Sequence, residues 1–405
     1  MRRDIDRLMA ERGYDAIVVS SAQGSDSSLL YVLNGVAIGG AVYIQKRGEP
    51  GVVCHGTMER GDALKTGLRC RNYGLYNMRE IFARAEGDRL RARVLFFERL
   101  FADEGVTGRV AFYGQMDQGG AYALLTAMQS QIAGLEVVGE FDGGVLMTAR
   151  RTKDRSEVDA IRRTGSATQS VVGDIERMLR GAARKGGRLL NESGEPMRVG
   201  EVKRRIRSTL LEHGLEDMGT IFALGRDAGL PHSRGEDDQE IVEGSPIVFD
   251  IFPRPASGGY HFDMTRTWCV GQAPQRLRVV FQDVLDCYRA VTDALRPGMR
   301  CAELQQIACR FFERRGHPTS CSDPTTQVGY VHSIGHGLGL DVHEEPRLSD
   351  VPGNDAVLEP GCVVTIEPGL YYPDEGIGVR LEDVWYLDEG ENFVNLTDYP
   401  MHLEI

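Results

Sequence analysis

The segment His332-Ser-Ile-Gly-His336-Gly-Leu-Gly-Leu-Asp-Val-His343 contains three histidines spaced among three glycines. Glycines let the backbone approach other groups closely, and imidazoles bind metals or move protons near neutral pH. A single histidine is more often a hydrogen-bonded structural residue than a ligand. The interpretation of this segment therefore depends on the acidic residues elsewhere in the chain.

Four carboxylates interrupt segments that otherwise have the apolar character of buried strands. They are Asp250 in Pro-Ile-Val-Phe-Asp, Asp263 in Tyr-His-Phe-Asp-Met-Thr-Arg-Thr, Glu367 in Thr-Ile-Glu-Pro-Gly and Glu382 in Val-Arg-Leu-Glu-Asp. A buried carboxylate without a partner is costly, so four of them in apolar strands need a common source of positive charge. A pair of metal ions is the simplest source.

Strand geometry predicts how these groups meet. Residues 247–270 are typical of two strands joined by Phe-Pro-Arg-Pro-Ala-Ser-Gly-Gly, and such a hairpin brings Asp250 near Asp263. Two carboxylates that close repel each other unless a cation lies between them. Alternation along a strand places Arg380 and Glu382 on one face.

The donor set indicates the kind of metal. Two divalent cations balance the four carboxylates, and His336 adds one neutral nitrogen. Four oxygen donors and one imidazole favour manganese, iron or cobalt over structural zinc. Metals about 3.5 to 4 Å apart can share a water molecule and lower its pKa, which suits amide hydrolysis.

Composition limits the remaining classes of function. The chain has 405 residues, of which 41% are hydrophobic and 26% charged, as in a globular protein of two or three domains. Its formal charge of −12 argues against a nucleic-acid or anionic-membrane partner. The charged residues 1–13 lack the apolar core of a secretory signal, and no apolar run reaches transmembrane length. We expect a cytoplasmic protein with eight scattered, reduced cysteines.

The order of elements predicts two domains. An α/β domain over residues 1–152 has strand-like segments at 15–20, 41–45, 51–54 and 109–113 and helical stretches such as 84–104. An α+β domain over 153–405 has helices expected at 154–180, 198–214, 274–294 and 301–316, with strands at 220–270 and towards the end. An exposed loop is expected at 181–197.

On these motifs the chain resembles the pita-bread metallopeptidase superfamily, which includes methionine aminopeptidase, aminopeptidase P, prolidase and the metal-free creatinase. The motifs are Asp-Met-Thr-Arg-Thr, Gly-His-Gly-Leu-Gly-Leu-Asp-Val-His-Glu, Ile-Glu-Pro-Gly and Arg-Leu-Glu-Asp. The resemblance covers nearly the whole chain. It implies an α+β pita-bread catalytic domain over 153–405, preceded by a smaller creatinase-like α/β domain.

The resemblance also implies roles for individual residues. The metal ligands would be Asp250, Asp263, His336, Glu367 and Glu382. Glu367 would also act as the acid/base. Catalytic histidines His232 and His343 would contact the scissile amide and stabilise the tetrahedral intermediate. Arg380 would hydrogen-bond ligand carboxylates, and His332 and Tyr371 would line the substrate pocket, although core packing explains Tyr371 equally well.

Among superfamily members, the additional N-terminal domain favours those that cleave Xaa-Pro bonds. The resemblance then implies a dinuclear metallopeptidase, a prolidase acting on short proline-containing peptides. Its cofactors would be two divalent ions, Mn2+ first, with Co2+, Fe2+ or Zn2+ as alternatives, and it would form a homodimer.

Alternatives are aminopeptidase P, an enzyme acting on non-peptide C–N or C–S bonds, and a non-catalytic peptide-binding module. Non-catalytic relatives typically lose ligands, and creatinase has no use for five of them. The link from Asp250 to Asp263 is longer than is common in the family, so Arg254 or His261 could reshape the pocket.

Overall fold

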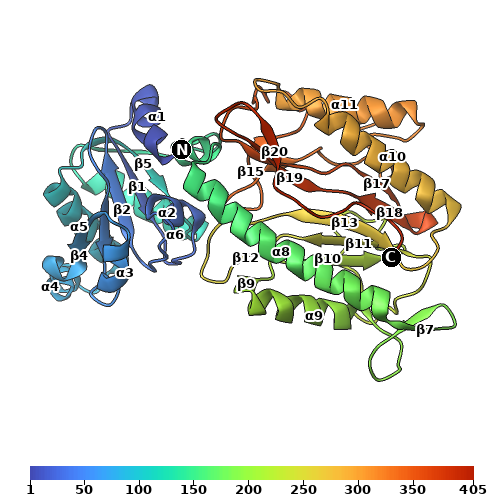
Figure 1. Cartoon of the computed structure of the whole chain (residues 1–405). Coiled ribbons are helices and arrows are strands. Elements are labelled where there is room, and N and C mark those ends of the chain that lie inside the picture. Colours follow the sequence, from blue (N-terminus) through green and yellow to red (C-terminus); the bar gives the residue numbers. More distant parts are fainter. The chain divides into compact units, whose positions relative to one another are not determined.

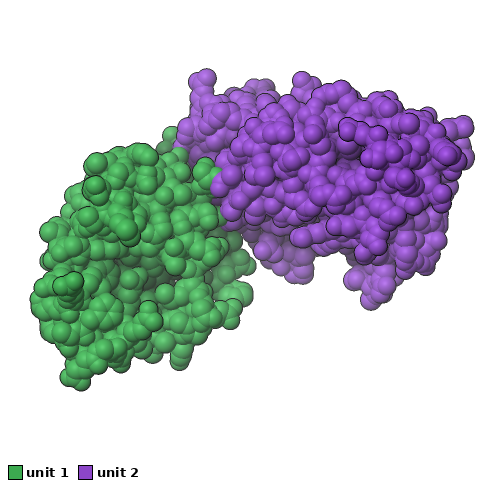
Figure 2. Space-filling view, turned by 90° about the horizontal axis from the view of Figure 1, so that it is seen from below, with its two compact units in different colours: residues 1–150, 257–259 green, residues 151–256, 260–405 purple.

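The computed structural model describes residues 1–405, which form two compact units. One unit comprises Met1–Arg150 and Ser257–Gly259, and the other comprises Arg151–Ala256 and Tyr260–Ile405 (Figure 2). The division falls two residues before the predicted boundary. None of the helices has the length and apolar character needed to span a bilayer.

The first unit is built on a six-stranded sheet with the order β4-β3-β2-β1-β5-β6 (Figure 1). Its strands are β1 (Ala16–Ser20), β2 (Val42–Lys46), β3 (Val52–His55), β4 (Arg69–Asn72), β5 (Gly108–Tyr113) and β6 (Leu135–Val138). Strand β1 pairs parallel with β5 and antiparallel with β2. The helices are α1 (Ile5–Arg12), α2 (Ser27–Val32), α3 (Arg60–Lys65), α4 (Met78–Arg84), α5 (Arg89–Glu104), α6 (Gln118–Gln131) and α7 (Val145–Arg150), with 3-10 turns at Arg2–Asp4 and Tyr73–Tyr76. This is the predicted α/β pattern.

Helix α5 supplies much of the core of this unit through Phe96, Phe97 and Phe101, which are buried. The helix was predicted to begin at residue 84, but it begins at Arg89. The backbone is left-handed at Glu86 (φ 54°) and Gly87 (φ 82°), which breaks the helical hydrogen bonding between α4 and α5.

The second unit combines four long helices with antiparallel strands. The helices are α8 (Arg155–Gly181), α9 (Val199–Glu212), α10 (Gln275–Thr292) and α11 (Cys301–Arg314), with a 3-10 turn at Pro373–Glu375. One sheet has the order β10-β11-β13, from β10 (Ile221–Leu224), β11 (Pro246–Ile251) and β13 (Met264–Cys269). Another has the order β15-β14-β16-β19-β20, from β14 (His336–Gly337), β15 (Glu344–Arg347), β16 (Val363–Ile366), β19 (Asp383–Leu387) and β20 (Phe393–Asn395). Two-stranded pairs are formed by β17 (Gly369–Tyr372) with β18 (Ile377–Arg380), β9 (Leu215–Glu216) with β12 (Arg254–Pro255), and β7 (Ala183–Lys185) with β8 (Arg188–Leu190).

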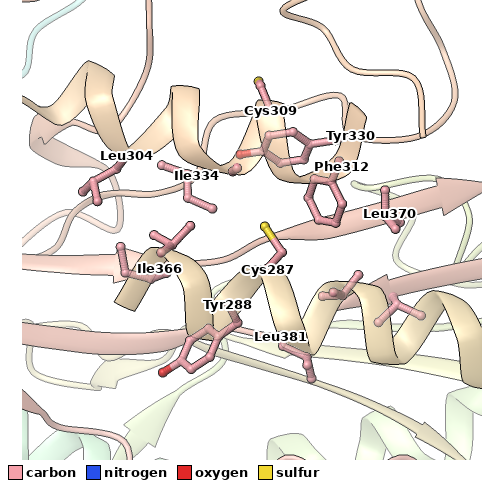
Figure 3. Close-up of a cluster of buried hydrophobic side chains, with 14 of the residues drawn as sticks. Cys287, Tyr288, Leu304, Cys309, Phe312, Tyr330, Ile334, Ile366, Leu370 and Leu381 are labelled. Carbon is pink, nitrogen blue, oxygen red and sulfur yellow. The ribbon is translucent and has the colours of Figure 1, made fainter. Parts of the chain in front are cut away.

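Two apolar layers attach these helices to the strands. Helices α8 and α9 bury Val172 and Ile206 in one cluster with Phe249 and Trp268 of the three-stranded sheet. Helices α10 and α11 pack on β16, β17, β18 and β19 through a second cluster, shown in Figure 3. The helices therefore cover the strands on their apolar side and leave the polar side chains of β11, β13 and β18 to face one another.

Helix α8 begins as the sequence predicts. Asp154 accepts a hydrogen bond from the backbone N–H of Glu157, and the Glu157 carboxylate accepts one in return from the N–H of Asp154. The four predicted helices of this unit all occur, with ends within about two residues of those expected.

Two expectations were wrong. The expected loop at 181–197 contains the hairpin β7–β8, in which Gly186 and Gly187 form the turn with positive φ. The cysteines were expected to be reduced, but Cys309 and Cys321 form a disulfide. The chain folds back after α11 and brings their Cα atoms to 6.3 Å. The other six cysteines are free.

Candidate metal centre

The predicted carboxylates lie at the ends of neighbouring strands. Asp250 lies on β11 and Asp263 immediately precedes β13, and the antiparallel register sets Asp250 opposite Thr265. The predicted hairpin is therefore confirmed. Glu382 lies between β18 and β19 and forms a backbone bridge with Thr265. Glu367 follows β16 directly.

Two of these carboxylates converge with a histidine of β14. Ligand-type atoms of Asp263, His336 and Glu382 all lie within 4.8 Å of one another. His336 Nε2 also lies 3.4 Å from Glu367 Oε1 and 3.7 Å from Asp263 Oδ2. The charge of Asp250 contributes to raising the pKa of Asp263, as expected for adjacent carboxylates. Asp263, His336, Glu367 and Glu382 thus gather in one group, and Asp250 lies close enough to Asp263 for its charge to act there.

The ring of His336 is held in an orientation suited to binding a metal. Its Nδ1–H donates to the backbone carbonyl of Gly337 at 3.0 Å, and this fixes the lone pair on Nε2, on the side of the carboxylates. Burial lowers the pKa of His336 to about 3, so the ring is neutral near pH 7. A neutral imidazole is the form that binds metals.

The buried carboxylates of this group have too little positive charge around them to be stable as anions. Burial, and then the neighbouring carboxylates, raise the pKa values of Asp263 and Glu382 well above their ordinary range. Burial raises the pKa of Glu367 to about 8, although the Arg380 guanidinium opposes the shift. Buried anions of this kind need a compensating cation.

Two carboxylate oxygens indicate where such a cation fits. Oδ1 of Asp250 and Oδ1 of Asp263 are buried and have no hydrogen-bond partner. Unsatisfied buried acceptors beside a neutral imidazole are the ligands that divalent ions bind. The residues of this group therefore fit divalent metal ions.

Arg380 connects several parts of the site. Its Nη2 forms an ion pair with Asp250 Oδ2 at 2.5 Å, and its Nη1 donates to the Tyr371 hydroxyl at 2.8 Å and to the Pro231 carbonyl at 3.3 Å. Its Nε donates to Thr265 Oγ1 at 3.2 Å. The same hydroxyl donates to Glu382 at 2.7 Å, so Arg380 and Glu382 share one face, as predicted.

Tyr371 and His332 continue this network. The Tyr371 hydroxyl donates to His332 Nε2 at 2.9 Å, and His332 Nδ1–H donates to the Ser333 carbonyl at 2.7 Å. Burial raises the pKa of Tyr371 to about 12 and lowers that of His332 to about 4. The Tyr371 side chain is thus fully buried, and its hydroxyl is hydrogen-bonded to both His332 and Arg380. The proposed pocket-lining roles of these two residues remain predictions.

The two predicted catalytic histidines are exposed. The His343 ring meets the His336 ring edge to face, with centroids 4.3 Å apart. Partial burial of its ring lowers the pKa of His343, and the charges of Asp250 and His232 are near enough to affect it. His232 follows Pro231, whose carbonyl Arg380 holds. His343 thus contacts the ring of a predicted ligand, and His232 follows a residue that is bonded to Arg380.

Sequence reasoning missed the hydroxyls that orient the ligands. Thr265 bonds Glu382, and Thr365 lies 3.4 Å from Glu367 and accepts from the His336 backbone N–H. Each threonine lies on a strand, two residues from a ligand just beyond the strand end: Thr265 of β13 comes after Asp263, and Thr365 of β16 comes before Glu367. The alternation of strands would have identified them.

A buried ion pair was also missed. Lys153 Nζ lies 3.0 Å from Glu344 Oε2, with 1% and 5% of their side chains exposed. Glu344 also accepts a hydrogen bond from the Asp341 N–H, so the pair fixes the segment that carries His343. No local pattern predicts a partner so distant in sequence.

The long link between Asp250 and Asp263 does not place Arg254 in the site. Its guanidinium forms an ion pair with Glu216 at 2.6 Å across the β9–β12 pair. His261 is buried, and its backbone N–H donates to the Gly339 carbonyl beside the histidine-rich segment. Of the two residues, only His261 contacts a segment of the site.

The chain is similar in sequence to curated peptidases. It is 34% identical over 202 residues to the Xaa-Pro dipeptidase of Pyrococcus furiosus, a match that covers 49% of this chain and 54% of that protein. It is 29% identical over 260 residues to the probable dipeptidase PepE of Mycobacterium bovis, covering 64% of this chain and 62% of that one. The chain thus spans about half to three fifths of the length of these relatives.

Solved structures share the fold over the whole chain. The Xaa-Pro dipeptidase from Bacillus anthracis has a TM-score of 0.76 at 21% identity, covering 100% of this chain and 99% of that one. The X-Pro aminopeptidase from Thermotoga maritima has a TM-score of 0.75 at 21% identity, with 98% and 99% covered. These similarities confirm the predicted fold, a pita-bread domain preceded by a smaller α/β domain. Residues 159–389, more than half of the chain, match the family model described as metallopeptidase family M24, and the protein belongs to that family.

Proposed function

We propose that this protein is a dinuclear metal-dependent hydrolase that cleaves the Xaa-Pro bond of short peptides, with dipeptides as its main substrates. The observation that carries the proposal is the convergence of Asp263, His336 and Glu382 with Glu367 around unsatisfied carboxylate oxygens. The similarity to the Xaa-Pro dipeptidase of Pyrococcus furiosus supports the choice of substrate.

In this proposal the cations are held by Asp250, Asp263, His336, Glu367 and Glu382. Bound divalent ions supply Lewis acidity and make a water molecule more acidic. Manganese is the first choice because four of the five donors are carboxylates. Co2+, Fe2+ and Zn2+ are the alternatives that metal replacement would compare.

The protein side chains would divide the remaining work. Glu367 accepts the proton of the attacking water and delivers it to the departing amine, since it lies beside the other ligands and is only 15% exposed. His232 and His343 donate hydrogen bonds to the scissile carbonyl as negative charge develops on its oxygen.

Arg380 would keep this arrangement in register. It holds the Asp250 carboxylate, the Tyr371–His332 pair and the Pro231 carbonyl beside His232 at once. A shift of one of these groups by about 1 Å can reduce the rate about a hundredfold. The rigid guanidinium of Arg380 would therefore help catalysis by fixing their positions. The side chains of His332 and Tyr371 would border the space for the proline.

The proposal extends to a cytoplasmic homodimer. Six of the eight cysteines are free thiols, which suits a reducing compartment, whereas the Cys309–Cys321 pair does not. Size-exclusion chromatography with light scattering would test the dimer, and cell fractionation would test the location.

The direct test compares two peptides. Protein stripped of metal and then given Mn2+ should hydrolyse a dipeptide ending in proline, and a Glu367→Gln variant with unchanged fold should not. Hydrolysis of a tripeptide with proline in second place, but not of the dipeptide, would identify an Xaa-Pro aminopeptidase instead. Failure to cleave either peptide in the presence of bound metal would contradict Xaa-Pro specificity.

A further inference from the structure

The first unit contains a cavity that the proposed peptidase chemistry does not use. It has a volume of about 600 Å³ and is lined by Ser20, Ser21, Ala22, Gln23, Gly40, Arg93, Gln115, Met116 and Asp117. This volume lies in the range of small-molecule sites in proteins. The lining comes from the end of β1 and the segment after it, from Gly40 before β2, from the segment after β5 and from helix α5.

The position of the cavity in the sheet is one where ligands commonly bind. Strands β1 and β5 are parallel neighbours, and the cavity lies at their carboxyl ends. From β1 the chain continues to β2 on one side, and from β5 it continues to β6 on the other. Connections that diverge in this way leave a crevice between the two strand ends.

Gly114 keeps these two strand ends close together. It has a φ of 113°, and a Cβ atom there would lie 2.1 Å from the Ser20 carbonyl oxygen. Any other residue would push the segment after β5 away from β1. The close approach fixes the segments that line the cavity on either side.

Arg93 brings a positive charge that no protein group neutralises. Its guanidinium lies over the rings of Phe96 and Phe97, at 5.4 and 5.1 Å from their centroids, and it forms no ion pair or hydrogen bond. Burial lowers its pKa, although an arginine remains charged at neutral pH. A guanidinium has five N–H donors in a planar fork, which suits a carboxylate.

Asp117 brings the opposite charge to the same cavity. Its Oδ1 caps helix α6 by accepting from the Gly120 N–H at 3.0 Å, which leaves Oδ2 without a protein partner. Asp117 and Arg93 do not form an ion pair with each other. The cavity therefore presents a separate cation and anion, with Ser20, Gln23 and Gln115 as further polar groups.

We propose that this cavity binds a zwitterionic amino acid, whose carboxylate pairs with Arg93 and whose ammonium group pairs with Asp117. Ala22 and Met116 offer contacts to an apolar side chain. A ligand with two negative charges, such as a phosphate ester, fits less well because Asp117 faces the same space. The inference does not depend on the proposed peptidase activity.

The test is calorimetric titration of the full-length protein with L-methionine, N-acetyl-L-methionine and L-methionine amide. Wild-type protein should bind about one L-methionine per chain, and binding should saturate at L-methionine concentrations below about 10 mM. Both blocked derivatives should bind at least about tenfold more weakly. Arg93→Met should weaken L-methionine binding by about tenfold or more. Asp117→Asn should weaken it several-fold while preserving the helix cap, because asparagine caps equally well.

Two control variants separate this site from others. Arg91→Met removes an exposed arginine of the same helix, outside the cavity, and should leave binding unchanged. His336→Ala perturbs the candidate metal centre and should also leave it unchanged. The proposal is overturned if wild-type protein shows no saturable binding, if N-acetyl-L-methionine binds as tightly as L-methionine, or if binding is lost in His336→Ala but not in Arg93→Met.

Discussion

Thr265 gives the sharpest prediction about the candidate metal centre. Its fully buried hydroxyl donates to Glu382 Oε2 at 2.7 Å and accepts from Arg380 Nε at 3.2 Å. Thr265→Val keeps the shape of the side chain but removes both bonds. Glu382 then loses the group that orients it, and a buried guanidinium N–H loses its acceptor.

The expected effect is on metal affinity. Loss of a hydrogen bond that orients a ligand typically weakens binding by about 10 to 100-fold, or about 1.4 to 2.8 kcal/mol. Calorimetric titration of metal-free protein with Mn2+ would measure it, together with the rate of dipeptide hydrolysis at saturating metal.

Thr168→Val is the matched control. Thr168 is also fully buried, but its hydroxyl donates to the Thr164 carbonyl within α8. This variant should bind Mn2+ as wild type does. A change of less than about threefold in the Mn2+ affinity of Thr265→Val, or an equal loss of affinity in both variants, would show that Thr265 does not orient Glu382.

Three further predictions concern the stability and covalent state of the second unit, which contains both tryptophans of the chain and can therefore be followed by fluorescence during urea unfolding. Lys153→Met leaves Glu344 buried without the counter-charge of Lys153 and should lower the free energy of unfolding by about 3 to 5 kcal/mol. Adding Glu344→Gln should restore part of this loss. If the double variant loses as much stability as the two single variants together, the ion pair is contradicted. Burial lowers the pKa of His332 from 6.5 to about 4. As the pH falls, His332 is therefore protonated in the unfolded state before it is protonated in the folded state, and this favours unfolding. The free energy of unfolding of the wild type should thus fall by up to about 3 kcal/mol between pH 7 and pH 4 because of this group, and that of His332→Gln should fall correspondingly less. Parallel pH profiles of the two proteins would argue against a neutral buried ring. Cys321→Ser should lower stability by about 3 kcal/mol by releasing the bond to Cys309, and alkylation of unreduced protein should count six free thiols, not eight.

The features that the sequence predicts well are those encoded by local patterns. Helices α8 to α11 follow from their apolar spacing, and the start of α8 also follows from its Asp154 cap. The hairpin carrying Asp250 and Asp263 follows from two strand-like runs around a turn-rich segment. Charged residues in otherwise apolar strands indicate the candidate metal centre. The alternation rule placed Arg380 and Glu382 together, and the shared hydroxyl of Thr265 agrees with it.

The features that it did not predict depend on contacts between distant parts of the chain. Thr265 and Glu382 are 117 residues apart, and Lys153 and Glu344 are 191 apart. A buried lysine has no sequence signature of its own, because lysine is common on surfaces. The cavity beside Arg93 arises from sheet order, which single-sequence patterns do not determine.

We propose that two catalytic divalent ions are held by Asp250, Asp263, His336, Glu367 and Glu382. The most direct measurement is the metal content of dialysed protein after loading with Mn2+, determined by mass spectrometry for wild type and for the Asp263→Asn and His336→Ala variants. We predict two manganese ions per wild-type chain, and fewer ions with loss of dipeptide hydrolysis in each variant that retains its fold. No bound metal in wild type, or an unchanged metal content in both variants, would contradict the claim.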